Sequence, residues 1–194
     1  MILPVLSYGH RILRQKCKEI SPDYPDLELL VNNLWDTMNN DNGCGLAAPQ
    51  VGIAVRLFIV DSKITFENID PEDQEFYFVK GDTGIRETFI NAKILDYSGH
   101  SWEDEEGCLS IPNMSQKVKR PWSITIDYCD KDFNRQVKTY EGSTARVIQH
   151  EYDHTDGILY IDHLSPLTRR LIDGRLKRIS KGQIPANYLM TYIK

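Results

Sequence analysis

Apolar residues recur along the chain with two different periods, and these periods predict its helices and strands. Between residues 26 and 38, large apolar side chains recur at spacings of three and four, the period of an amphipathic helix. Gly43 follows a polar run after this helix and is typical of a helix end. Strands are predicted where apolar residues are continuous or alternate with polar ones, in the ranges 55–60, 88–95, 122–128 and 135–140.

Two more helices are predicted in the C-terminal part of the chain. Residues 143–155 form the first, with Ser143 or Thr144 as its N-cap and Gly157 close to its end. Residues 166–180 form the second, and its core side is expected to consist of Leu167, Leu171, Ile172, Leu176 and Ile179. Short strands mixed with three helices indicate an α+β fold, with antiparallel sheets around the central helix and one helix near each end of the chain.

The length of 194 residues suits one domain that spans residues 1–194. Residues 62–86 are polar and acidic apart from an aromatic run, and we expect a surface insertion with one short strand at 76–79. Residues 166–194 are expected to form the C-terminal helix and a tail. No internal repeat or low-complexity segment divides the chain further.

Composition and charge argue against several classes of protein. The sequence contains neither an apolar run of 18 residues nor an export leader, so no membrane association is expected. Four cysteines without a C-x-x-C pair fit a reducing compartment, and we expect a cytoplasmic protein. The net charge of −5 argues against nucleic-acid binding, and no specific DNA partner is expected.

Charge is distributed unevenly, because the C-terminal part of this acidic chain is basic. From Pro166 onward there are seven Lys/Arg and one Asp, a local charge of +6. A solvated amphipathic helix is the simpler interpretation. The alternative is a surface that docks on an anionic partner, formed by Arg169, Arg170, Arg175, Lys177, Arg178 and Lys181.

The strongest chemical signal is the H-E-x-x-H motif formed by residues 150–154 on the predicted central helix. His150 and His154 are four apart, so both imidazoles lie on one helix face and can bind one cation. Glu151, one position along, can face water bound to that cation. The alternative is a surface helix with two unrelated histidines.

A catalytic site needs a third protein ligand besides the two histidines. The downstream positions used by zinc proteases do not supply one, because residue 160 is tyrosine and no glutamate follows Glu151. Cys108, just after Gly107, is the upstream candidate, and a thiolate with two imidazoles suits Fe(II) or Zn(II). A buried structural thiol and a nucleophile remain alternative interpretations of this cysteine.

Three segments together resemble the signature motifs of peptide deformylases, in the same order and spacing. They are Gly43-Cys-Gly-Leu-Ala-Ala-Pro-Gln-Val-Gly-Ile53, Glu106-Gly-Cys-Leu-Ser110 and Gln149-His-Glu-Tyr-Asp-His154. The resemblance implies a metal-dependent hydrolase that removes the formyl group from the N-terminal formyl-methionine of nascent polypeptides, by attack of water bound to the metal. It also implies ferrous iron, Fe(2+), as the ion, with Zn(2+), Ni(2+) or Co(2+) as substitutes.

The resemblance also assigns roles to particular residues. The metal ligands fall on Cys108, His150 and His154, and the general acid/base on Glu151. Gln50 and the backbone N–H of Leu109 become the two donors to the oxyanion. The substrate would lie extended between two glycine-containing stretches, and its contacts would come from Gly43, Cys44, Gly45, Gly107 and Val147.

Some positions depart from the pattern common in the family. Ser143 and Thr144 stand where apolar residues are frequent, and Ser115 replaces an arginine that contacts substrate in many members. We expect these changes to alter substrate preference but not activity. Glu106 is expected to pair with Arg120 in support of the site.

The resemblance also implies that the basic C-terminal helix docks on the ribosome, as it does in some relatives. Two other functions stay open at this point. A zinc endopeptidase would cleave internal peptide bonds without needing Cys108. A metal-binding or docking module would have no need of Gln50 and Glu151.

Overall fold

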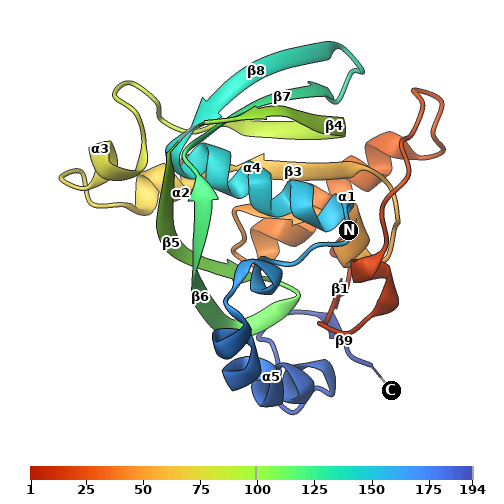
Figure 1. The fold of residues 1–194 in the computed structure, drawn as a ribbon. Coiled ribbons are helices and arrows are strands. Elements are labelled where there is room, and N and C mark those ends of the chain that lie inside the picture. Colours follow the sequence, from red (N-terminus) through yellow and green to blue (C-terminus); the bar gives the residue numbers. More distant parts are fainter. Residues whose placement is uncertain (99, 194) are drawn as a thin grey trace.

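The chain forms a mixed helix and antiparallel-sheet fold, seen in Figure 1. The computed structural model describes residues 1–98 and 100–193. Gly99 and Lys194, the last residue of the predicted tail, lie outside the described part. The main sheet has the strand order β2-β3-β4-β7-β8, with every neighbouring pair antiparallel. Its strands are β2 (Gly45–Ala47), β3 (Leu57–Asp61), β4 (Arg86–Tyr97), β7 (Ser123–Cys129) and β8 (Arg135–Glu141).

Two smaller sheets complete the strand structure. One is the antiparallel hairpin of β5 (Ser101–Cys108) and β6 (Ile111–Pro121). In the other, β1 (Val5–Leu6) pairs in parallel with β9 (Met190–Thr191), close to the two ends of the chain. The helices are α1 (Leu27–Asn40), α2 (Ser62–Asn68), α3 (Gln74–Tyr77), α4 (Gly142–Thr155) and α5 (Pro166–Ser180).

Helix α4 lies at the centre, between the main sheet and the β5–β6 hairpin (Figure 1). Ala145 and Ile148 bury its apolar side in a core with the side chains of β3, β4 and β7. Its other side is also buried, although it carries polar residues, among them Arg146, His150 and His154. Buried polar groups need partners, so this side of α4 is where a functional site is expected.

The spacing of apolar residues correctly predicted α1, because one face of this helix is apolar and packs on the side of the main sheet opposite α4. Leu30, Leu34 and Met38 recur every four residues and are buried with Leu46 and Leu57. The predicted end of α4 is also confirmed, because Gly157 follows the helix with a left-handed φ of 76°. None of the described helices is both long enough and apolar enough to cross a membrane.

Three local predictions were wrong. Residues 76–79 do not form a strand, since α3 covers the first half of the range and its aromatic side chains pack on Trp102. Glu141, not Ser143 or Thr144, occupies the N-cap position of α4. The predicted core side of α5 is only half right, because Leu176 and Ile179 are buried while Leu167 and Leu171 are 69% and 77% exposed.

Strands β5 and β6 were missed by the pattern of apolar residues. β5 contains the run Glu103-Asp-Glu-Glu106, which has no apolar alternation. The carboxylates at 103 and 105 face solvent, and only Glu106 is buried. Its charge is compensated by arginines from elsewhere in the fold, which a local pattern does not reveal.

Candidate metal centre

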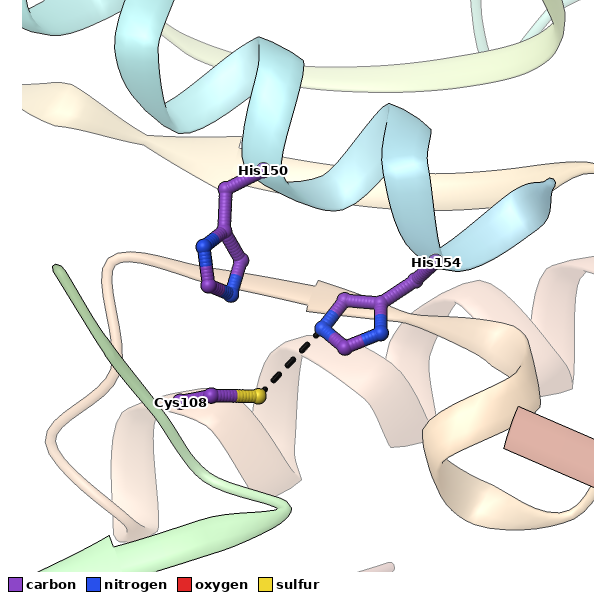
Figure 2. Close-up of side chains that lie close together, drawn as sticks. All are labelled: Cys108, His150 and His154. Carbon is purple, nitrogen blue, oxygen red and sulfur yellow. Dashed lines mark hydrogen bonds between the residues drawn. The ribbon is translucent and has the colours of Figure 1, made fainter. Parts of the chain in front are cut away.

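Two elements bring the predicted metal ligands together. His150 and His154 extend from the same face of α4, one turn apart, and Cys108 faces them from the end of β5 (Figure 2). The ligand atoms of the three residues lie within 4.8 Å of one another, and Cys108 Sγ is 3.3 Å from His154 Nε2. Both histidines are buried. A thiolate and two imidazoles so arranged form a donor set that Fe(II) and Zn(II) favour.

The electrostatics of the cluster also fit a cation. Burial lowers the pKa of His154 well below its ordinary value, which keeps this imidazole in the neutral form that binds metals. Burial alone would lower the pKa of His150 too, but its bonds with Cys108 and Glu106 raise it well above the ordinary value. Anionic groups therefore surround His150, in an environment that stabilises positive charge.

Glu106 holds His150 in one orientation. His150 Nδ1 donates to Glu106 Oε2 at 3.0 Å, which leaves Nε2 available to a metal. Arg120 donates to both oxygens of the same carboxylate, at 2.6 and 2.9 Å, so the predicted pair is confirmed. Arg146 adds a third bond at 2.7 Å. Burial opposes the charge, but His150 and Arg120 hold the pKa of Glu106 well below its usual range.

Arg146 was not recognised from the sequence. The one available signal was a charged residue among small and apolar ones, one turn before His150 on the predicted helix. Its guanidinium also donates to the backbone oxygens of Val118 and Trp102, so it joins both strands of the hairpin to α4. The position of Cys108 relative to the histidines thus depends on this buried arginine.

Replacing Glu106 by glutamine should weaken the metal site although none of the three ligands is changed. The amide keeps the shape but not the charge, so Arg146 loses its ion pair, Arg120 keeps only its pair with Asp153, and His150 loses its anionic acceptor. Losses of about 10–100-fold in metal affinity or activity are typical of such partners. The measurement is metal bound per chain in competition with a chelator. Glu103→Gln, an exposed change on the same strand, is the control, and equal affinity in the two variants would contradict the prediction.

Glu151 is the buried carboxylate next to the cluster. It lines the same cavity as His150, and within the described residues its Oε2 has no hydrogen-bond partner. Burial raises its pKa to about 7, so it can gain or lose a proton near neutral pH. Gly45 makes room for it, because a β carbon at that position would lie 2.6 Å from Glu151 Oε1.

Gln50 and Leu109 both lie next to Cys108. The Gln50 side chain accepts from Ala47 N through Oε1 at 2.8 Å, which directs its amide Nε2 towards Cys108 Sγ at 3.5 Å and Ser110 Oγ at 3.4 Å. Leu109 follows the cysteine in the turn between β5 and β6. A side-chain amide and a backbone turn beside the cluster can together donate to a negatively charged oxygen.

A cavity of about 580 Å³ connects these groups. It is lined by all five residues predicted to contact substrate, Gly43, Cys44, Gly45, Gly107 and Val147, together with Gln50, Leu109 and Glu151. His154 is not among the lining residues. Polar lining groups that sequence reasoning missed include Thr65, Asp104, Arg146 and Tyr188, which come from separate parts of the chain. Ser143, also in the lining, was noted as a departure from the family pattern.

Thr65 shows that the 62–86 segment takes part in the cavity wall. Helix α2 is attached to the first turn of α4 by the buried pair Ser62 Oγ and Thr144 Oγ1, which are 2.9 Å apart. Ser62 also bonds the backbone of Ile85 at the other end of the segment. The polar residue at 144 therefore serves to attach α2, and α2 brings Thr65 beside Cys44.

Comparison with known proteins gives one consistent result. Residues 2–170 match the family model described as polypeptide deformylase. A peptide deformylase of Christiangramia forsetii is 47% identical over 192 residues, covering 99% of this chain and 96% of the relative. The solved peptide deformylase of Legionella pneumophila has 31% identity and a TM-score of 0.77, with 95% and 99% of the two chains covered. That of Acinetobacter baumannii, solved with Met-Ala-Ser bound, has 30% identity and a TM-score of 0.73, with 84% and 99% covered.

Proposed function

The chain belongs to the peptide deformylase family of metallohydrolases, enzymes that remove the N-terminal formyl group from nascent polypeptides, and from this premise we propose how its own residues perform the reaction. Cys108, His150 and His154 hold one divalent transition-metal ion, ferrous iron in the first place, with zinc, nickel or cobalt as substitutes. Such an ion lowers the pKa of water and acts as a Lewis acid towards the formyl group.

Glu151 moves the proton in this proposal. It takes a proton from the attacking water and returns it to the amine that leaves when the C–N bond of the formamide breaks. The products are formate and a free N-terminal amine. The observation that carries this role is a buried carboxylate that lines the same cavity as His150, has no hydrogen-bond partner for Oε2 among the described residues, and has a pKa raised to about 7.

Gln50 and Leu109 stabilise the negative charge that develops on the formyl oxygen. The Gln50 amide is held by Ala47 N, so it does not need to reorient as the charge forms. The Leu109 N–H is the second donor, and Leu109 lines the same cavity as Gln50. Each such donor contributes about 3–4 kcal/mol to the stability of the transition state in comparable hydrolases.

The substrate is proposed to lie along the cavity as an extended peptide, between β2 and the end of β5. The Met-Ala-Ser bound to the Acinetobacter relative supports a peptide of this kind as the ligand, because it has the sequence of a chain start without its formyl group. The first side chain then lies against Cys44 and Val147. Ser143 and Thr65 add hydroxyl groups to the same wall, so this pocket is more polar than Cys44 and Val147 alone would make it.

The direct test is formate release from formyl-Met-Ala-Ser by protein loaded with iron under anaerobic conditions, since Fe(II) and a ligating thiolate are both sensitive to oxidation. Acetyl-Met-Ala-Ser and a longer peptide without a formyl group are the controls. Release of formate and a free N-terminal amine from the formylated peptide, with no free amine from the acetylated one, supports the proposal. Cleavage of internal bonds would indicate an endopeptidase, and full metal occupancy without any turnover would indicate a binding module.

We also propose that α5 docks the enzyme on the ribosome. The six basic side chains predicted for this role are exposed. Arg169 is paired with Asp162 and Lys177 with Asp173, whereas no ion pair involves Arg170 or Arg178 within the described part of the chain. Deleting the helix is a poor test, because Leu176 and Ile179 belong to the core.

Charge reversal tests docking without removing the helix. The double variant Arg170→Glu and Arg178→Glu should lose most of its co-sedimentation with ribosomes at low salt, because polyanion binding depends on the number of cationic contacts. Turnover of a formylated tripeptide should stay within about twofold, since neither residue lines the cavity. Lys63→Glu with Lys80→Glu is the control for net charge, and co-sedimentation equal to that control would exclude this surface.

A further inference from the structure

The segment that follows α5 runs back along the active-site side of the molecule. After α5, β9 pairs with β1 beside the turn of the β5–β6 hairpin (Figure 1). Val5 N donates to Leu189 O at 2.9 Å, and Ser7 N donates to Thr191 O at 2.9 Å. On the other side, Asn113 Nδ2 donates to Pro185 O at 3.0 Å. The stretch between Pro185 and Thr191 is thus held at both ends.

Tyr188 lies in the middle of this stretch and reaches the cavity. Its hydroxyl donates to the backbone oxygen of Leu109 at 2.6 Å, and its side chain is half-buried in the cavity wall. The two residues are 79 positions apart in the sequence. A hydrogen bond therefore connects the C-terminal segment directly to the residue that follows Cys108.

The turn that Tyr188 contacts depends on partners outside the hairpin. The pairing of β5 with β6 is regular up to Gly107 and Ser115 and shifts register before Cys108. Two other distant segments fix the same turn: Tyr8 N donates to Ser110 O at 2.7 Å, and Gln50 Nε2 approaches Ser110 Oγ at 3.4 Å. The Leu109 carbonyl is the part of the turn that Tyr188 holds.

We propose that Tyr188 is a positioning residue of the active site, which orients the Leu109 peptide so that its N–H faces the formyl oxygen. This inference rests on the proposed function, because it assigns a role within the same reaction. The N–H and the C=O of Leu109 are separated by a single Cα, so fixing the carbonyl restricts the direction of the N–H. The C-terminal segment thereby supplies the residue that orients one of the two oxyanion donors.

The test is Tyr188→Phe, which removes the hydroxyl and keeps the ring. We expect kcat for formyl-Met-Ala-Ser to fall about tenfold, less than the loss of a whole oxyanion donor, because the N–H stays in place but is oriented less well. KM, metal content and the melting temperature should stay close to the wild-type values, since the ring still covers the cavity wall. A purely structural role would instead lower the melting temperature without a selective effect on kcat.

Tyr192→Phe is the matched control. The Tyr192 hydroxyl accepts a hydrogen bond from Ala186 N at 2.9 Å, so it stabilises the same tail, and among the described residues it has no hydrogen bond to the turn. A fall in kcat confined to Tyr188→Phe supports the inference. Equal kcat in the two variants, with wild type active, would overturn it and leave the proposed function intact. A wild-type protein that released no formate would overturn both.

Discussion

Glu151→Gln is expected to lower kcat for a formylated peptide by about 10²–10⁴-fold while the protein keeps its metal. The amide has nearly the shape of the carboxylate, so the narrow space against Gly45 remains filled. It does not accept and return a proton, and this is the step assigned to Glu151. A cation in the neighbouring cluster favours the ionised form of the wild-type carboxylate, so the base is available at neutral pH.

The measurement pairs single-turnover kinetics with metal analysis on the same preparation. Glu141→Gln is a suitable control, because Glu141 directly precedes α4 but does not line the cavity. If Glu151→Gln had turnover near the wild-type value with one metal per chain, Glu151 would not be the group that transfers the proton. Loss of metal together with activity would show that Glu151 contributes to binding the ion instead.

Cys108→Ser is expected to lose most of its bound metal and, with it, at least about 100-fold in activity, more than the loss of a supporting partner such as Glu106. A serine hydroxyl stays protonated at neutral pH and is a poor ligand for the soft ions that thiolate selects. His150 and His154 would then be two ligands of an incomplete site. Metal per chain after dialysis and formate release are the measurements.

Cys129→Ser is the control, since Cys129 is only half-buried and does not line the cavity. The result also separates the candidate functions. A zinc endopeptidase with its ligands elsewhere would be indifferent to the change at Cys108. Full metal content and full activity in Cys108→Ser would therefore refute the assigned donor set, whatever the substrate.

The helices were predictable because their signals are local. In α1 and α4, residues three and four apart share a face, so the apolar stripe and the His150–His154 pair can be read from spacing alone. The hairpin β5–β6 could not be read in this way. Its buried Glu106 looks like one more residue of an acidic loop until Arg120 and Arg146 are seen beside it.

Sequence alone determined the α+β class, the three main helices and the two histidines with Glu151, because backbone periodicity places residues within one or two turns of each other. Cys108 was one candidate for the third ligand until the resemblance to a family linked it to the histidines, since it lies 46 positions from His154. Three further features were decided by the tertiary structure. Arg146 pairs with Glu106 beside the metal ligands, Thr65 lines the cavity, and Tyr188 bonds the turn at Leu109. These contacts join segments far apart in the chain, and their meeting depends on the packing of the whole fold, which no local spacing encodes.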